Sequence, residues 1–226
     1  MLNQRFDSKF QELSNVVTVH DFGLAAGTRA FLVMELLNGA TLREELRREK
    51  RLAPPRALAI LRGVCAAVEA AHRRQLLHRD LKPENVFLVR SDSQEMAKVL
   101  DFGIAKFLPS DTHQATADTG TGMLLGTLQY MSPEQLRGAA ATPAWDLWAL
   151  AVVAYEMLTG AHPYAGGTLA EFSRDVAVGH FIPVTTNLPE APPRWQKFFE
   201  HTLAPEPEHR PRSASLFLAE LESALG

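Results

Sequence analysis

The sequence predicts an α+β fold in which a small β-rich part precedes a larger, mostly helical part. Two apolar runs between residues 16 and 36 flank a turn region with a glycine, which is the pattern of a β-hairpin. From residue 54 onward, apolar residues recur mainly at helical spacing, with Pro or Gly at the helix ends. The 226 residues, 46% of them hydrophobic, suffice for one large domain or two small lobes that share a cleft.

Composition and charge argue against several classes of protein. The formal net charge of −3 and the pI near 6.2 argue against a broad nucleic-acid-binding surface. Basic residues in segment 43–51 alternate with glutamates, which indicates a solvated helix face. The eight histidines lack His-x-x-x-His spacing, so a zinc site is not expected.

The cysteine content and the most apolar segment indicate where the chain resides. The single cysteine, Cys65, permits no internal disulfide and favours a reducing compartment, so we expect a cytoplasmic protein. The most apolar segment, Leu147 to Leu158, contains Glu156 and is shorter than the roughly 20 residues of a membrane span. We therefore expect a buried core helix there and no membrane segment in this chain.

The first fifty residues predict short elements. Residues 1–14 show helical spacing of apolar residues, and two strands are expected at Val16 to Asp21 and Ala30 to Leu36. Asn38-Gly39 indicates a turn. Thr41 is a suitable N-cap for a helix that runs to about Lys50.

The middle of the chain predicts a long helix followed by a hairpin. Pro54-Pro55 begins a helix that ends before His78. Two strands, Val86 to Val89 and Ala97 to Leu100, are expected around a polar turn at Arg90 to Glu95. This hairpin would place the residues just before and just after it, Asn85 and Asp101, at one end of a small ribbon.

The last part predicts a polar segment and then helices. Residues 106–125 are rich in Ser, Thr and Gly, and they form either a disordered surface loop or a functional segment. Thr142 and Pro143 begin a helix that ends at Gly160. Further helices are expected at about Leu169 to Val178, Arg194 to Leu203 and Ser213 to Leu225.

Two motifs carry the chemistry: residues 78–85, His-Arg-Asp-Leu-Lys-Pro-Glu-Asn, and residues 101–103, Asp-Phe-Gly. Two acids, an amide and a lysine at loop positions can hold metal ions beside a polyphosphate and accept a proton from a hydroxyl. This is the chemistry of phosphoryl transfer. Taken singly, each motif could be an ordinary loop or turn, but their ordered combination between apolar strands is specific.

With these motifs the sequence resembles the Hanks-type protein kinase family, most of all its bacterial serine/threonine branch, from about Val16 to Leu225. The resemblance implies a protein-kinase-like fold, ATP and Mg²⁺ as cofactors, and a protein substrate. Carried over, it makes Asp80 the catalytic base and Lys82 the phosphate-contacting lysine, while Thr127 would touch the base. The Mg²⁺ ligands would be Asn85 and Asp101.

The resemblance also implies a nucleotide site and two lobes. Met34 would be the gatekeeper, the hinge backbone from Glu35 to Leu37 would bond adenine, and Phe87 would form part of the adenine floor. Residues 1–37 would then be an incomplete N-terminal lobe with the hinge. Residues 38–226 would be the helical C-terminal lobe with the catalytic loop and activation segment.

Further roles follow from the same resemblance. Glu134 would pair with Arg210, and Asp146 would brace the catalytic loop from the long core helix. The polar segment 106–125 would be an activation segment, in which Thr119 and Thr121 are candidate phosphorylation sites.

The sequence departs from the family pattern before the hinge. No Gly-x-Gly-x-x-Gly occurs there, and the only lysine before Lys50 is Lys9, which stands where the pattern has a glutamate. We therefore expect a truncated N-terminal lobe, because the gene model starts too late or the gene has lost its 5′ portion. A two-stranded remnant has an open edge, which a second copy or a partner chain could cover.

Two functional hypotheses follow. The first is a serine/threonine protein kinase that transfers the ATP γ-phosphate to protein hydroxyls, impaired in this chain because half of the phosphate clamp is missing. The second is a pseudokinase, a silent module that serves as a protein-binding or scaffolding surface.

Overall fold

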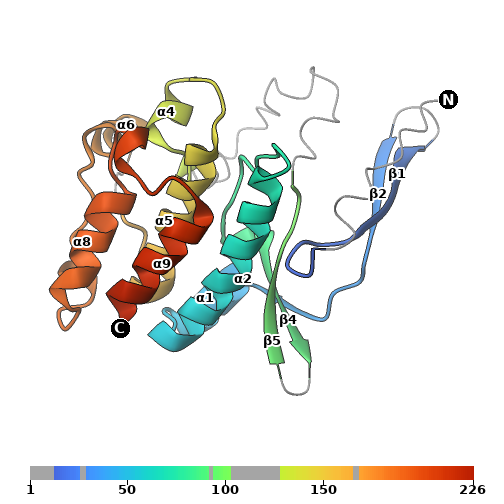
Figure 1. Ribbon diagram of the computed structural model, residues 1–226, viewed down its shortest axis with the longest axis horizontal. Coiled ribbons are helices and arrows are strands. Elements are labelled where there is room, and N and C mark those ends of the chain that lie inside the picture. Colours follow the sequence, from blue (N-terminus) through green and yellow to red (C-terminus); the bar gives the residue numbers. More distant parts are fainter. Residues whose placement is uncertain (1–12, 26–28, 92–93, 103–127, 165–167) are drawn as a thin grey trace.

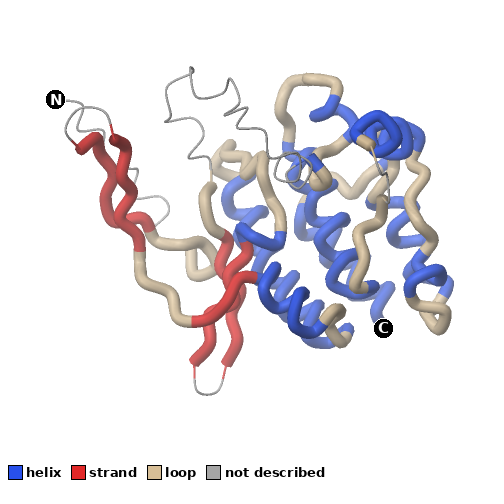
Figure 2. Tube along the Cα trace, turned by 180° about the vertical axis from the view of Figure 1, so that it is seen from behind, coloured by secondary structure: helices blue, strands red, loops and turns tan. Residues whose placement is uncertain are grey.

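The computed structural model describes residues 13–25, 29–91, 94–102, 128–164 and 168–226. Most of the helix expected at residues 1–14 and the polar segment 106–125 therefore lie outside the described residues. A slender β-hairpin stands at one end of the molecule, a second β-ribbon lies in the middle, and helices fill the other end (Figures 1 and 2). This arrangement agrees with the α+β prediction.

The first hairpin consists of β1 (Val19–Ala25) and β2 (Arg29–Met34), which pair antiparallel. Both strands were expected, but the boundaries differ. β1 begins later and continues through Gly23, where a turn was expected, and Gly23 pairs with Phe31 of β2. The Phe31 ring lies over the space that a side chain at position 23 would occupy. The glycine thus serves cross-strand packing within the hairpin.

The central sheet has the order β3-β4-β5, with β3 at Gly39–Thr41, β4 at Val86–Ser91 and β5 at Gln94–Val99. β3 was missed, because Asn38-Gly39 was interpreted as a turn alone. A Cβ atom on Gly39 would lie 1.9 Å from the Leu88 carbonyl oxygen, so only glycine lets the chain approach β4 this closely. The strands of the β4–β5 ribbon are longer than expected because backbone pairing continues through its polar outer end.

Helix boundaries follow local capping signals closely. In α1 (Leu42–Glu49), the Glu44 N–H donates to the Thr41 side chain, and the Thr41 N–H donates to the Glu44 carboxylate at 2.8 Å. In α5 (Pro143–Thr159), the chain stops at Gly160 in a left-handed conformation. The other helices are α2 (Pro54–His72), α4 (Pro133–Leu136), α6 (Leu169–Val178), α7 (Val184–Asn187), α8 (Pro193–Thr202) and α9 (Ala214–Leu225), with short 3₁₀ turns η2 (Pro83–Asn85) and η5 (Pro207–His209).

The core is centred on α5, whose residues from 146 to 155 are all buried. Trp148 and Tyr155 on this helix are completely inaccessible; α2, α7 and α8 pack against it, and α9 packs against α2 and α8. The segment expected to be a buried core helix is therefore one. Among the described residues, no helix is long and apolar enough to cross a membrane.

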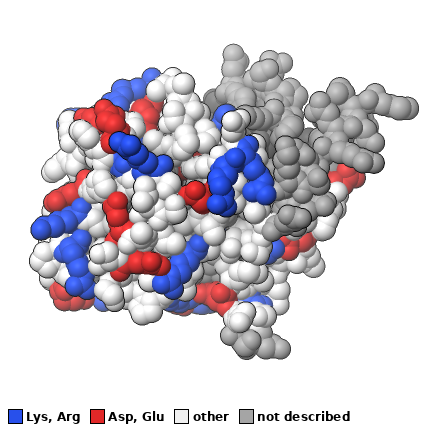
Figure 3. All heavy atoms as spheres, in the orientation of Figure 1, with Lys and Arg blue, Asp and Glu red and all other residues white. Residues whose placement is uncertain are grey.

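Charged side chains of both signs are interspersed over the helical surface in the view of Figure 3. Many form pairs: Arg56, for example, donates to Glu45, Glu49 and Glu95. Within segment 43–51, Arg43 pairs with Glu84 and Glu156, and Arg48 pairs with Glu45 and Glu49.

Candidate active site

The loop that follows α2 is anchored to the core helix by Asp146, which is 1% exposed. The Asp146 carboxylate accepts hydrogen bonds from the backbone N–H of His78 at 2.9 Å and of Arg79 at 2.8 Å. His72, at the end of α2, lies 2.7 Å from the same carboxylate. One buried side chain therefore fixes both the entry to the loop and the backbone just before Asp80.

His78 connects this loop to the end of β5. Burial lowers the pKa of His78, so the ring is neutral at pH 7. Its Nε2 lies 2.8 Å from the Leu100 carbonyl, which can only accept, so Nε2 carries the proton. Nδ1 then accepts the Asp80 N–H at 3.3 Å, and the ring packs edge-on against Phe102. The loop with Asp80 and the turn with Asp101 are thereby held together.

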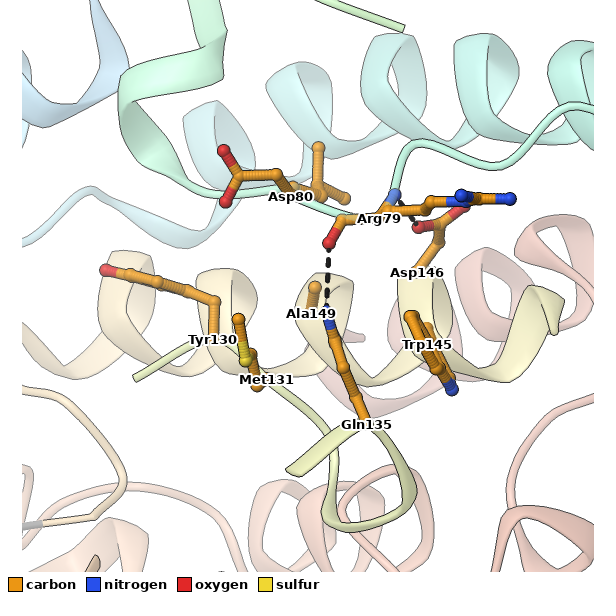
Figure 4. Close-up of a pocket in the computed structure, with 9 residues that line it drawn as sticks. Arg79, Asp80, Tyr130, Met131, Gln135, Trp145, Asp146 and Ala149 are labelled. Carbon is orange, nitrogen blue, oxygen red and sulfur yellow. Dashed lines mark hydrogen bonds between the residues drawn. The ribbon is translucent and has the colours of Figure 1, made fainter. Parts of the chain in front are cut away.

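Two residues of this region adopt left-handed backbone conformations that are uncommon outside glycine: Arg79 with φ of 69° and Asp101 with φ of 60°. The strained Arg79 backbone is held by hydrogen bonds at both its N–H and its carbonyl. Asp146 accepts its N–H, and Gln135 of α4 donates to its carbonyl at 3.2 Å (Figure 4). Backbone strain maintained by surrounding contacts is frequent at functional sites.

Asp80, Lys82 and Asn85 form one hydrogen-bonded cluster. The Lys82 ammonium lies 2.8 Å from the Asp80 carboxylate, and the Asn85 amide nitrogen donates to the Asp80 carbonyl at 2.7 Å. The Asp80 side chain is 47% exposed, so an incoming hydroxyl can reach it. A small cavity lies between this loop and α5, lined by residues that include Arg79, Gln135 and Ala149. In Figure 4 the Asp80 carboxylate points away from this cavity.

Asn85 and Asp101 lie at the same end of the β4–β5 ribbon, as the hairpin prediction requires. Val86 pairs with Val99 in the β4–β5 register, and the Leu100 N–H donates to the Asn85 carbonyl at 2.9 Å. Because the Asn85 amide nitrogen is used by Asp80, its oxygen is the atom available to a cation.

These donors fit Mg²⁺. An amide oxygen and an exposed carboxylate are hard oxygen ligands, and Mg²⁺ needs few protein groups because it retains several waters. Within the described ranges, no cluster of three or more His, Cys, Asp or Glu side chains suggests a different, all-protein metal cage.

The residues expected at the hinge follow β2. Met34 is 41% exposed, Glu35 and Leu37 are half-buried, and the chain then enters β3, which lies on β4. Thr41 of β3 is paired with Phe87, so the expected adenine floor lies on the strand next to the segment that leaves the hinge.

Glu134 and Arg210 form a buried ion pair, in which the two terminal guanidinium nitrogens of Arg210 each donate to one Glu134 carboxylate oxygen at 2.9 Å. Arg210 also lies over the Trp148 ring and donates to backbone carbonyls. This pair fastens α4, which follows the polar segment, to the core of the helical lobe.

Sequence reasoning missed a second cluster beside the catalytic loop. Arg43 of α1 donates to Glu84 at 2.7 Å and also to Glu156 and the Tyr130 hydroxyl. Burial opposes the Arg43 charge, but the hydrogen bonds that Arg43 donates to Glu156 outweigh it and raise the pKa of Arg43. The only sequence signal was Glu84 within the motif, since the other partners are far apart in the chain.

Three expected site residues, Thr119, Thr121 and Thr127, lie outside the described residues, as does Gly103. Their roles remain predictions.

The family model for the protein kinase domain matches residues 6–220, which includes every element of the site. The chain belongs to the protein kinase family. This confirms the protein-kinase-like fold and the resemblance on which the site residues were assigned. The roles of the individual residues are not tested by the match.

Curated relatives of this kinase chain are bacterial serine/threonine-protein kinases. It is 37% identical to pkn3 of Myxococcus xanthus over 212 residues, 92% of this chain and 39% of that protein. It is 39% identical to PknA of Mycobacterium tuberculosis over 208 residues, 89% of this chain and 45% of that protein. The chain thus spans less than half the length of these relatives.

A solved kinase structure agrees with the family assignment. The crystal structure of a double-mutant kinase domain of Mycobacterium tuberculosis PknI superimposes with a TM-score of 0.70 and 26% identity. The match covers 94% of this chain and 72% of that domain.

Proposed function

We propose that this chain is a serine/threonine protein kinase that transfers the γ-phosphate of ATP to hydroxyls of a protein substrate. The observation that carries the proposal is the cluster of Asp80, Lys82 and Asn85, joined to the Asp101 turn by the Leu100–Asn85 backbone bond. It combines an accessible carboxylate, a cation and two metal-ligand candidates at one end of a rigid ribbon.

Each of these side chains has a task in the proposed reaction. Asp80 accepts the proton of the incoming hydroxyl, and the ammonium of Lys82, 2.8 Å from it, neutralises charge on the transferred phosphoryl group. Asn85 and Asp101 would hold Mg²⁺, which when bound neutralises charge on the phosphates. Asp146 and His78 keep the base and the metal ligands in register.

We further propose that transfer by this chain is slow. The residues before the hinge carry neither a Gly-rich loop nor a clamp lysine, and the template for this chemistry uses both. The proposed division, an incomplete N-terminal lobe at 1–37 and a helical lobe at 38–226, accounts for this deficit.

The buried single thiol of Cys65 supports a reducing, cytoplasmic setting.

The test is Mg²⁺-dependent transfer of labelled phosphate from ATP by the purified chain, to itself and to a generic basic protein, with Asp101→Asn as the matched variant. We expect weak transfer to Ser or Thr that Asp101→Asn and chelation of Mg²⁺ both abolish. Transfer that survives the substitution would refute the assigned metal site. No transfer by the folded chain would refute catalysis by this polypeptide.

The hairpin favours a second candidate function, a protein-binding module of the pseudokinase type. Phe31, Val33 and Met34 on β2 are each more than 40% exposed, and Leu36 after it is 99% exposed. Such apolar residues, beside a strand edge that pairs with no other strand among the described residues, favour pairing with another chain. A folded chain that shows no transfer and no Mg²⁺-dependent nucleotide binding would support this candidate.

A further inference from the structure

Two segments connect the β1–β2 hairpin to the rest of the chain, and the first is attached to β5. The Val17 N–H donates to the Val99 carbonyl at 3.0 Å, and the Val99 N–H donates to the Asn15 carbonyl at 2.8 Å. The Asn15 side chain also donates to the Ala97 carbonyl at 2.8 Å. The chain entering the hairpin therefore forms a short parallel extension of the strand that leads to Asp101.

The second segment is attached through Glu35, the first residue after β2. Its N–H donates to the Thr18 carbonyl at 2.9 Å, and one carboxylate oxygen accepts both the Thr18 N–H at 2.7 Å and the Lys98 ammonium at 2.6 Å. Burial would raise the pKa of Glu35, but the bonds from Lys98 and Thr18 outweigh burial and lower it. The carboxylate is therefore charged and joins both connecting segments to β5.

Lys98 lies where such a bond can affect the nucleotide site. It is directly opposite Phe87 in the β4–β5 register, and directly opposed residues of an antiparallel pair share a face. Its side chain is only 11% exposed. The Glu35–Lys98 pair therefore joins the hinge segment to the residue beside the expected adenine floor, three residues before Asp101.

We propose that Lys98 is a positioning residue for the purine. Through its ion pair with Glu35, Lys98 fixes the distance between the hinge backbone and Phe87, and so the space that a purine would occupy. This inference rests on the proposed nucleotide-binding function. The geometry of the hinge is the property that the pair controls.

The test uses Lys98→Met, which keeps most of the length of the side chain and removes its charge, Glu35→Gln, and the double variant. Lys197→Met is the matched control, because Lys197 is exposed and makes no hydrogen bond or ion pair with the described part of the chain. Calorimetry measures the affinity for adenosine, which has no phosphate, and for Mg²⁺–tripolyphosphate, which has no purine. Hydrogen exchange of the nucleotide-free protein measures protection of the Thr18 and Glu35 amides.

We expect Lys98→Met and Glu35→Gln each to weaken adenosine binding about 10-fold. The double variant should bind adenosine no more weakly than the single variant with the lower affinity, because both substitutions remove the same ion pair. Tripolyphosphate affinity stays unchanged, whereas general loosening of the fold would weaken both ligands. The Thr18 and Glu35 amides exchange faster in Lys98→Met and at the original rate in Lys197→Met.

Unchanged adenosine affinity in Lys98→Met, or an equal loss for both ligands, would overturn the inference while leaving the proposed function in place. Adenosine binding lost to the same extent in Lys197→Met would also overturn it. If the unsubstituted chain binds neither ligand, the proposed function is refuted, and the positioning role of Lys98, which rests on it, is refuted as well. The two failures are thus distinguished by the unsubstituted chain alone.

Discussion

Replacing Glu134 by Gln tests how far the helical lobe depends on its buried ion pair. Arg210 has a fully buried side chain, and the Glu134 side chain is 10% exposed. Glutamine keeps the size of the side chain but removes its charge, and it presents an N–H group to one of the guanidinium donors. The substitution therefore leaves a buried, uncompensated charge on Arg210.

The expected cost follows from the surroundings of Arg210. Breaking a buried pair by removing one partner costs about 3–5 kcal/mol. Because Arg210 also donates to the carbonyls of Ala204 at 2.7 Å and Pro205 at 2.9 Å, we expect the lower end, about 3 kcal/mol. For a chain of this length, that lowers Tm by roughly 6–12 °C.

Urea unfolding and thermal melting measure this change, and the control is Glu222→Gln. The Arg62–Glu222 pair is equally short at 2.8 Å, but its side chains are 57% and 41% exposed, so its loss should cost under about 1 kcal/mol. Similar losses in the two variants would refute the argument that burial, and not ion pairing as such, sets the cost.

The same pair predicts a pH dependence. Arg210 holds the pKa of Glu134 below its ordinary value of 4.5, against the opposing effect of burial. A lowered folded-state pKa gives stability that is present above the unfolded pKa and is lost as the pH falls through the folded pKa. The stability gap between the unsubstituted chain and Glu134→Gln should therefore be full at pH 7 and narrow below about pH 4.5.

Three further predictions concern single residues. Burial raises the pKa of Cys65 to about 12, so a thiol reagent at pH 8 should label it only after denaturation; rapid labelling of the folded chain would contradict its burial. Gly39→Ala should destabilise the chain in urea by at least about 1–3 kcal/mol, because the new Cβ meets the Leu88 carbonyl; no change would contradict this approach of β3 to β4. Asp146→Asn should cost about 1–3 kcal/mol, because an amide cannot accept both backbone N–H groups with equal strength, and should slow transfer per folded molecule; full activity would show that Asp146 does not hold the loop.

Local signals predicted most of the helical part. Thr41 with Glu44 specified the beginning of α1, and Gly160 specified the end of α5, because capping depends on residues close in sequence. The strands were predicted less well. β3 has only three residues, and it forms because Gly39 permits contact with a strand almost fifty residues later. Such non-local pairing leaves little pattern in the sequence.

The candidate site divides in the same way. Asp80, Lys82 and Asn85 lie in one short motif, so their proximity could be inferred from spacing. The partners of Arg43 and Lys98 could not, because these ion pairs cross more than forty residues of chain. Arg43 was interpreted as part of a solvated helix face, and no role was predicted for Lys98.

The most direct test of the account separates binding from chemistry at Asp80. In Asp80→Asn, the affinity for Mg²⁺ and ATP should remain close to that of the unsubstituted chain, because Asp80 is not among the proposed metal ligands. Phosphate transfer to Ser or Thr in a single turnover should fall about 10²–10⁴-fold, since the general base is lost. Transfer at the original rate by Asp80→Asn, with nucleotide binding intact, would contradict the assignment of Asp80 as the catalytic base.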